Sequence, residues 1–404
     1  MGCLKVSALL VSVLVTGLSI YLYTPIPDDL EEPWKLRIYT AGFKLLKLVG
    51  KVIDSTGCGS YGNTLRLLDT MAEAGAFKHK PSPFLDVTDT WFDGVKVRIY
   101  RPKSVHTPSP ALVYYHGGGW TFGSVGLYDR FTRQIAESAN ILVVSVEYSL
   151  APEHPFPIPF EDCVTATLHL LQNPQQYGVD GNKIAVGGDS AGGNLAAAVA
   201  LRLGNNKQLP RLSFQMLIYP CVQPLDLKLP SYTNPLNFFG TGPNDMAWYW
   251  AAYIGQTSHP DLVEAMVHNQ HTSASAKRSK YADFVDANTN LPKRFRRKET
   301  SRDVDYGNET LWAEIAPRAT NPYLAPLLAE DFTGVPPSLL VTAKYDVLRD
   351  ESIMYAQRLR KAGIKVAHRH YIAIHSVLVL DLFEVGRTAI ADIARDLQKH
   401  FSSN

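Results

Sequence analysis

Residues 184–199 read IAVGGDSAGGNLAAAV, and this stretch decides the fold. An apolar run typical of a buried strand passes through a glycine-rich turn into a run typical of a helix. The turn holds the pattern G-x-S-x-G, made by Gly188, Asp189, Ser190, Ala191 and Gly192. A serine on such a strand-to-helix turn carries its hydroxyl above the edge of the sheet. We therefore expect Ser190 to be a nucleophile; the alternative is a serine that only caps the helix.

Strand and helix patterns alternate on both sides of this turn. A hairpin is predicted over 85–102, further buried strands at 111–116, 141–148, 212–220, 338–346 and 366–371, and further helices at 127–139, 351–363 and 383–401. Strands that alternate with helices form a mostly parallel sheet with helices on both faces. The fold class expected is therefore α/β. Residues 222–320 show no strand rhythm, and we expect them to form a helical lid together with residues 24–80.

A second glycine-rich turn, HGGGW at 116–120, begins where the strand predicted at 111–116 ends. Its amides are expected to form an oxyanion hole, from the N–H groups of Gly117 and Gly118 beside that of Ala191. A phosphate-binding loop is the competing interpretation, but the Lys-Ser/Thr pair of such loops is missing. The remaining residues of the two motifs are expected to shape these turns without reacting themselves. They are His116, Gly119, Gly188, Asp189 and Gly192.

Composition and charge exclude several classes of function. Hydrophobic residues make up 46% of the chain and charged residues 19%, a balance that buries a sizeable core. The net charge of +2 gives no reason to expect a nucleic-acid partner. The one basic run, KRFRRK at 293–298, is interpreted as a solvated surface. The four cysteines form no metal-binding pattern, and no cofactor is expected.

The N-terminus predicts a compartment. Residues 6–23 form an uncharged, mainly apolar run of 18 residues, preceded by Lys5 and followed by an acidic segment. Such a run, with its positive flank in the cytoplasm, predicts a signal anchor with residues 1–5 as a cytoplasmic tail and 24–404 in the lumen. A cleaved signal peptide is the rival interpretation. The sequon at Asn308 is usable only in a lumen, so the location expected is the membrane of the endoplasmic reticulum, in single-pass type II orientation.

Several motifs together resemble the hormone-sensitive-lipase group of α/β-hydrolases, on the branch of arylacetamide deacetylase and neutral cholesterol ester hydrolase. They are YTPIPDDLEEPWK (23–35), HGGGW (116–120), YSLAPEHPFP (148–157), GDSAGGNLAAAV (188–199), LIYP (217–220) and YDVLRDE (345–351). The resemblance implies an α/β-hydrolase fold and a serine esterase or amidase that acts through an acyl-enzyme. It also implies a triad in the order Ser, acid, His, with Asp346 as the acid.

The base must then follow Asp346, where four histidines remain. His368 and His370 alternate within the last strand, and His400 lies near the C-terminus. His375 comes just beyond the strand, at the edge where Ser190 and Asp346 are expected, and the resemblance also places the base there. The family usually reads Asp-Gly-Phe-His-Gly at this point, whereas this chain has Ala373 and Ser376 in place of the two glycines. If either position needs a positive φ, the substitution strains the backbone.

The substrate class follows from the anchor and the aromatic insertion. The runs NFFG (237–240) and WYWAAY (248–253) either line an acyl pocket or form the insertion's own core. Both arrangements suit lipophilic esters or amides, including neutral lipid esters. The altered residues around His375 leave one alternative, a weakened or inactive relative that binds small hydrophobic ligands. The oligomeric state does not follow from the sequence.

Overall fold

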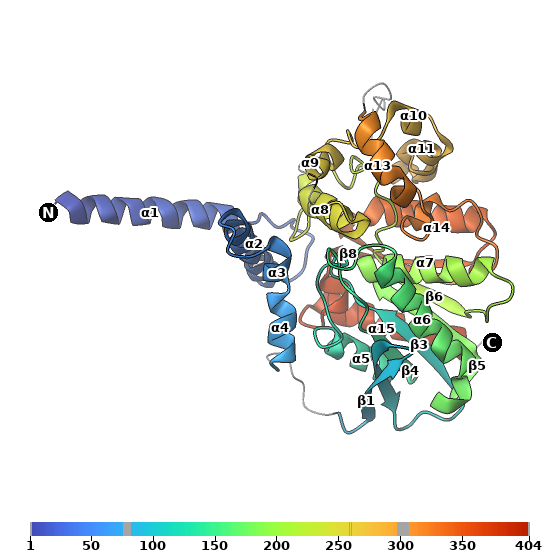
Figure 1. The fold of residues 1–404 in the computed structure, drawn as a ribbon. Helices are drawn as coiled ribbons and strands as arrows, with labels where there is room; N and C mark the ends of the chain where they lie inside the picture. Colours follow the sequence, from blue (N-terminus) through green and yellow to red (C-terminus); the bar gives the residue numbers. More distant parts are fainter. Residues whose placement is uncertain (1, 76–81, 258, 260, 297–306, 403–404) are drawn as a thin grey trace. The chain divides into compact units, whose positions relative to one another are not determined.

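The computed structural model describes residues 2–75, 82–257, 259, 261–296 and 307–402 (Figure 1). It contains two compact units, Met1–Leu67 and Leu68–Asn404. The first unit is helical, with α1 at Gly2–Leu22, α2 at Pro33–Ser55 and α3 at Tyr61–Leu65. Within the described residues, no helix is long and apolar enough to cross a membrane.

The second unit is built on one sheet of eight strands in the order β1-β2-β4-β3-β5-β6-β7-β8. The strands are β1 (Leu85–Phe92), β2 (Val95–Pro102), β3 (Ser109–Tyr115), β4 (Leu142–Val146), β5 (Val179–Asp189), β6 (Phe214–Ile218), β7 (Ser338–Tyr345) and β8 (Val366–Ile374). The β1–β2 and β2–β4 pairs are antiparallel, and all other pairs are parallel. The mostly parallel sheet predicted from the sequence is therefore confirmed, with an antiparallel hairpin at one edge.

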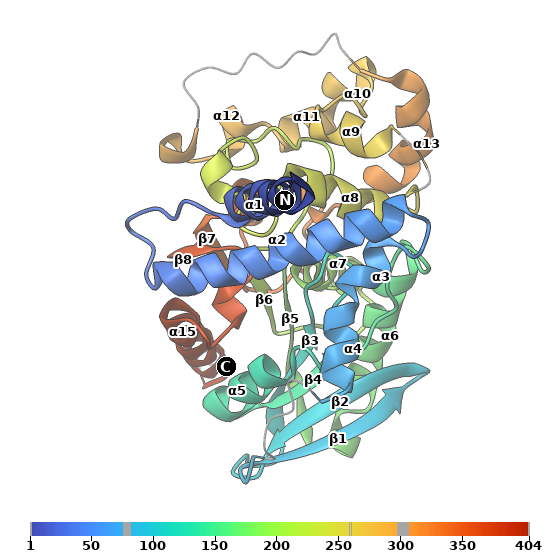
Figure 2. The ribbon, with the colours of Figure 1, turned by 90° about the vertical axis from the view of Figure 1, so that its left-hand side faces the viewer.

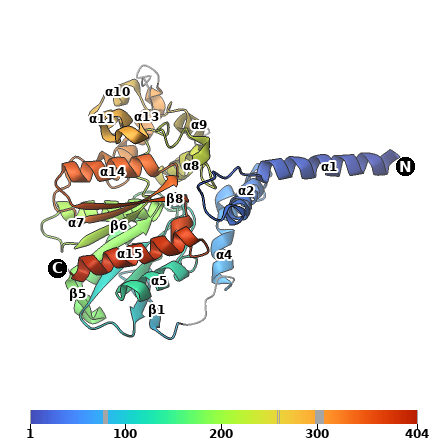
Figure 3. The same cartoon turned by 180° about the vertical axis from the view of Figure 1, so that it is seen from behind.

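Helices cover both faces of this sheet. The helices that follow the hairpin are α5 (Asp129–Ala139), α6 (Ile158–Gln172), α7 (Ala191–Asn205), α14 (Arg349–Lys361) and α15 (Glu384–Ser402), with α4 (Leu67–Glu73) before it. Helices α6 and α7 lie on one face, whereas α5 and α15 lie together on the other (Figures 1 and 3). Because β3 to β7 are covered on both sides, most of their residues are buried, apart from 180–183 at the start of β5, which explains their continuous apolar runs.

The hairpin shows how local sequence sets local structure. Strands β1 and β2 pair from Phe92 with Val95 outward, so Asp93 and Gly94 form the two-residue loop. Both loop residues have positive φ, 47° and 92°. A tight two-residue hairpin turn needs this conformation, which aspartate tolerates and glycine adopts without steric cost.

The insertion between β6 and β7 is helical. It contains α8 (Pro243–Ile254), α9 (Leu262–Val267), α10 (Ala274–Lys277), α11 (Lys280–Phe284), α12 (Ala287–Asn290) and α13 (Glu309–Ala319). These helices gather at one end of the second unit (Figure 2). Its role as a lid, like that of residues 24–80, stays a prediction.

The aromatic run of α8 serves mainly as core. Trp250 and Tyr253 are fully buried, and both rings pack on Trp120 of the HGGGW turn, with ring centroids 4.6 and 4.3 Å from that of Trp120. Of the two alternatives for WYWAAY, the structure therefore favours the insertion's own core for these two rings. They attach the insertion to the turn that follows β3.

Candidate active site

The sheet topology brings three predicted residues to one edge. Ser190 follows β5, Asp346 follows β7 and His375 follows β8, and these strands run parallel with only β6 between the first two. The carboxyl ends of parallel strands meet at the same edge of a sheet. Side chains that lie up to 185 residues apart in the chain therefore meet in one place.

The three side chains form a hydrogen-bonded chain. Ser190 Oγ lies 3.1 Å from His375 Nε2, and His375 Nδ1 lies 2.8 Å from Asp346 Oδ2. The second oxygen of Asp346 accepts the backbone N–H of Leu348 at 2.8 Å. Since the carboxylate can only accept, Nδ1 carries a proton and Nε2 is left to accept the serine proton. This tautomer is the one that general-base chemistry at Ser190 requires.

Burial and charge act in opposite directions on His375. Burial lowers the pKa of the imidazole, but the carboxylates of Asp346 and Asp189 outweigh it and raise the pKa of His375 above its ordinary value. Asp346 is fully buried and His375 is 6% exposed, so solvent screens these interactions little. The site therefore stabilises the imidazolium that forms when His375 takes a proton.

The backbone at Ser190 is strained in the manner of a nucleophile elbow. Ser190 has φ 54° and ψ −119°, and its side chain makes no capping hydrogen bond to α7. Capping is therefore not what holds this serine in place. A non-glycine residue in such a conformation costs about 1–3 kcal/mol, so the surrounding structure must impose it.

Two glycines let the elbow fit. A Cβ atom at Gly192 would lie 2.0 Å from the carbonyl oxygen of Tyr115, and one at Gly188 would lie 2.3 Å from that of Gly192. No side chain fits at such separations. The first turn of α7 is thereby packed directly against the end of β3, where the HGGGW turn begins.

Asp189 joins the two glycine-rich turns. Its carboxylate is 2% exposed and accepts three hydrogen bonds, from Tyr114 Oη at 2.6 Å, Gly117 N at 2.8 Å and Tyr128 Oη at 3.0 Å. Burial raises the pKa of Asp189, although the two hydroxyl donors and the nearby His375 oppose the rise. Sequence analysis predicts only a supporting role for Asp189, because its three donors lie far from it along the chain.

The contact with Asp189 corrects one predicted oxyanion donor. The N–H of Gly117 donates to the carboxylate, so it is not available to a substrate oxygen. The N–H groups of Gly118 and Gly119 have no acceptor among the residues that the structure describes. Ala191 is the first residue of α7, whose initial amides have no acceptor within the helix. The oxyanion donors that the geometry favours are therefore Gly118, Gly119 and Ala191.

The remaining motif residues shape the HGGGW turn. His116 is fully buried, stacks on Tyr148 with ring centroids 4.3 Å apart, and accepts a 2.7 Å hydrogen bond from Tyr148 Oη at its carbonyl oxygen. Burial lowers the pKa of His116 to about 4, so its imidazole is neutral at physiological pH. Gly119 has φ 58°, and a Cβ there would lie 2.5 Å from the Tyr249 ring. Tyr249 therefore packs against the oxyanion turn itself.

The residues around His375 answer the question raised by the missing glycines. Ser376 has φ 74°, in the region that favours glycine, whereas Ala373 lies within β8 and is not among the residues with positive φ. Only one of the two substitutions therefore strains the backbone. The imidazole nevertheless keeps its place, beside the buried ring of Tyr219 at a centroid distance of 4.5 Å.

The fold and the site define the class, a serine hydrolase on an α/β sheet. Residues 112–278 and 273–378 match a family described as alpha/beta hydrolase fold. The chain is 38% identical over 375 residues to rabbit (Oryctolagus cuniculus) arylacetamide deacetylase, with 91% of this chain and 92% of that protein covered. It is 35% identical over 378 residues to neutral cholesterol ester hydrolase 1 of Rattus norvegicus, with 91% of each chain covered.

A solved structure supports the same grouping. An esterase of Pyrobaculum calidifontis matches with a TM-score of 0.60 and 29% identity, covering 88% of this chain and 92% of that one. The chain belongs to the carboxylesterase family of arylacetamide deacetylase and neutral cholesterol ester hydrolase, within the α/β-hydrolases.

Proposed function

We propose that this carboxylesterase cleaves lipophilic carboxylic esters and aryl amides, including neutral lipid esters, by an acyl-enzyme mechanism. The observation that carries the proposal is the chain from Ser190 Oγ through His375 to Asp346, with separations of 3.1 and 2.8 Å. The relatives named for arylacetamide and cholesterol ester substrates support the substrate class. An inactive ligand binder is not favoured, because the strain at Ser376 leaves the base within reach of both partners.

The reaction follows from these positions. Ser190 Oγ attacks the carbonyl carbon while its proton moves to His375 Nε2, and Asp346 stabilises the charged imidazole. Amides of Gly118, Gly119 and Ala191 hold the negative oxygen of the tetrahedral intermediate. His375 then gives the proton to the leaving alcohol or amine, which leaves an acyl group on Ser190. A water molecule, deprotonated by His375, attacks this ester, and the acid departs as Ser190 regains its proton.

The test is covalent labelling combined with a substrate panel. A fluorophosphonate probe should label the wild-type protein at Ser190 and leave the folded Ser190→Ala variant unlabelled. Short aryl esters, arylamides and long-chain neutral lipid esters should then be compared by kcat/KM. A folded wild-type protein that neither reacts with the probe nor cleaves any of the three classes would refute the proposal.

We further propose that residues 6–23 anchor the protein in the membrane of the endoplasmic reticulum, with the catalytic unit in the lumen. The uncharged run behind Lys5 supports this, as do Leu14 and Ile20 of α1, each 71% exposed. Asn308 of the sequon is exposed at the start of α13.

The test is membrane extraction combined with glycosidase treatment. Wild type should resist carbonate extraction and lose mass on endoglycosidase treatment, whereas the gel mobility of Asn308→Gln should not change on that treatment. Equal gel mobility of both proteins would count against the lumenal orientation.

A further inference from the structure

The basic run at 293–298 does more than face solvent, at least in its described part. Residues Lys293–Phe295 form the short helix η3, and the Phe295 ring packs edge-on against His370 of β8, with ring centroids 5.8 Å apart. The Phe295 ring centroid lies 4.8 Å from the guanidinium carbon of Arg294 and 5.0 Å from that of Arg349, the first residue of α14. The aromatic ring thus holds two arginines close together, through attraction of each cation to its π-electrons.

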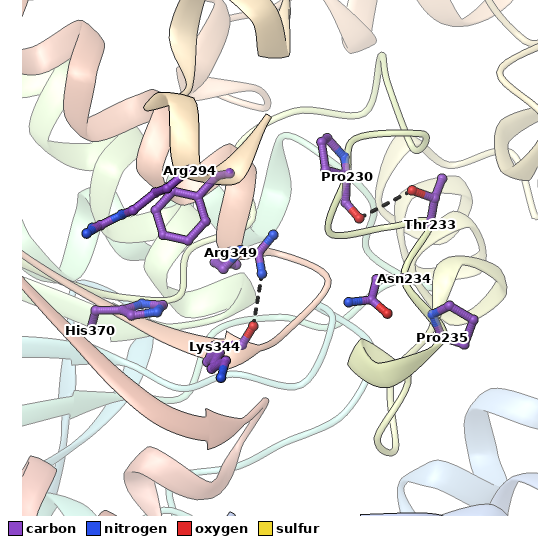
Figure 4. Close-up of a pocket in the computed structure, with 9 residues that line it drawn as sticks. Pro230, Thr233, Asn234, Pro235, Arg294, Lys344, Arg349 and His370 are labelled. Carbon is purple, nitrogen blue, oxygen red and sulfur yellow. Dashed lines mark hydrogen bonds between the residues drawn. The ribbon is translucent and has the colours of Figure 1, made fainter. Parts of the chain in front are cut away.

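These residues line a cavity of about 630 Å³ (Figure 4). Arg294, Lys344, Arg349 and His370 lie on one side of it, opposite a wall of neutral residues. That wall is formed by Pro230, Thr233, Asn234 and Pro235. The three cations come from three separate elements, and no carboxylate is among the described residues that line the cavity. None of the three predicted catalytic residues lines it either.

The described residues neutralise the two arginines only in part. Arg349 pairs through Nε with the buried carboxylate of Asp350 at 2.8 Å, and its Nη1 donates to the carbonyl oxygen of Lys344 at 3.1 Å. Its Nη2 has no acceptor among the described residues. The Arg294 guanidinium likewise has no acceptor and no ion-pair partner within the described part of the chain. Donor groups therefore remain on two arginines that face one cavity.

The imidazole of His370 lies in the positive potential of the cavity. Its Nδ1 lies 2.8 Å from Thr342 Oγ1, which fixes the ring at the cavity wall. Burial, together with the smaller effects of the charges of Arg349, Arg294 and Lys344, lowers the pKa of His370 to about 4. Like charges held together in this way raise the free energy of the empty cavity, and a bound anion relieves that repulsion.

We propose that this cavity binds a phosphate group, carried by an anionic lipid headgroup or by a free phosphate compound. Phosphate suits the donors because arginine presents a planar fork that matches two phosphate oxygens. The Asn234 amide nitrogen, which has no acceptor among the described residues, offers a further donor from the opposite wall. The cavity is larger than one phosphate group and leaves room for the organic part of the ligand.

The experiment measures phosphate binding to the full-length, detergent-solubilised protein by isothermal titration calorimetry. Inorganic phosphate is titrated at constant ionic strength, with chloride as the competing anion. Wild type is compared with Arg294→Gln, which removes one cation from the cavity, and with Asn234→Asp, which adds a negative charge to the opposite wall and keeps the oxygen that accepts Leu236 N. Lys293→Gln is the matched control, because it removes an exposed charge next to Arg294 that does not line the cavity. In parallel, flotation is measured with phosphatidylcholine vesicles that contain or lack phosphatidic acid.

The expected result is saturable phosphate binding that weakens about tenfold in each cavity variant and stays unchanged in Lys293→Gln. Binding to inorganic phosphate identifies the free compound as a sufficient ligand. A response to phosphatidic acid vesicles alone, lost in Arg294→Gln, assigns the ligand to a lipid headgroup. Binding that is equal in all variants, displaced equally by chloride, or absent from both assays overturns the proposal. Esterase activity of the same samples is recorded separately, so failure of the site is distinguishable from failure of the enzyme.

Discussion

Ser376 carries backbone strain directly beside the predicted base. Its φ of 74° belongs to the left-handed region, which costs a non-glycine residue roughly 1–2 kcal/mol. His375 precedes it and keeps hydrogen-bond distance to both of its partners. The strain is therefore absorbed by the turn into the short helix η5 (Val377–Val379) and does not displace the imidazole.

This contrast makes a paired prediction at Ser376 and Ala373. Ser376→Gly should raise the free energy of unfolding by up to about 1 kcal/mol and leave kcat/KM unchanged or higher, because glycine adopts this φ without strain. Ala373→Gly, in the fully buried end of β8, should lower the free energy of unfolding by about 1 kcal/mol. Denaturant unfolding and ester kinetics measure both. A loss of stability in Ser376→Gly would show that the serine side chain itself stabilises the turn.

A second prediction at the residue scale concerns His375. Replacing it by alanine should lower kcat about 10⁴- to 10⁶-fold, whereas His368→Ala, near the start of β8, should retain activity. The base must be neutral to accept the serine proton, and its pKa is raised. Activity should therefore fall on the acid side at a pH above about 6.5, the ordinary value for imidazole. Equal losses in both alanine variants would mean that the base is misassigned.

The fall in activity at acid pH, which is the acid limb of the pH profile, also tests the partner of His375. Asp346→Asn removes the charge that raises the pKa of the imidazole, so the limb should move to lower pH. The same change should lower kcat about 10⁴-fold, since asparagine no longer selects the reactive tautomer. The measurement is kcat/KM from pH 5 to 9. An unshifted limb with lowered kcat would assign the limb to a different group.

At the scale of elements, two glycine-rich turns become one site because a carboxylate joins them. Asp189, at the end of β5, accepts hydrogen bonds from the N–H of Gly117 and from the hydroxyls of Tyr114 and Tyr128. This holds the turn after β3 against the start of α7. The amides of Gly118 and Gly119 are thereby positioned by Asp189, which makes it a positioning residue for the oxyanion hole.

Asp189→Asn tests this positioning. An amide offers one oxygen to three donors, so the HGGGW turn should shift and kcat should fall about 10- to 100-fold with KM little changed. Inhibition by an aryl trifluoromethyl ketone, which forms an oxyanion on the enzyme, should weaken in parallel with kcat/KM. The exposed Asp86→Asn on β1 is the control. If Asp189→Asn only lowers the yield of folded protein, and the folded fraction is inhibited as strongly as wild type, Asp189 stabilises the fold and does not position the oxyanion hole.

The sequence predicted elements more completely than contacts. Strand and helix positions followed from apolar periodicity, and the edge shared by Ser190, Asp346 and His375 followed from parallel strand order. The engagement of Gly117 by Asp189 was missed, because a hydrogen bond across 72 residues leaves no periodic trace. The cavity beside Arg294 was missed for the same reason, since its cations come from elements that only the fold brings together.

At the scale of the whole molecule, buried ionisable groups make stability depend on pH. Burial raises the pKa of Glu351 to about 8, against hydrogen bonds from Val222 N at 2.6 Å and Tyr232 Oη at 3.0 Å. The folded protein thus holds a proton that the unfolded chain has released above about pH 4.5. His375, with its raised pKa, likewise contributes stability that is present below about pH 6.5 and lost as pH rises through its folded pKa.

These signs predict a decline in stability on the alkaline side of pH 6.5. Between about pH 6.5 and 8, Glu351 alone should lower the free energy of unfolding by up to about 1.4 kcal/mol per pH unit, because the native state binds the extra proton. Glu351→Gln keeps an oxygen acceptor for Val222 but cannot ionise, so its slope should be shallower by that amount. Glu264→Gln, an exposed change on α9, should keep the wild-type slope. Denaturant unfolding at each pH measures the slopes, and equal slopes in all three proteins would show that Glu351 ionises no differently in the folded and unfolded states.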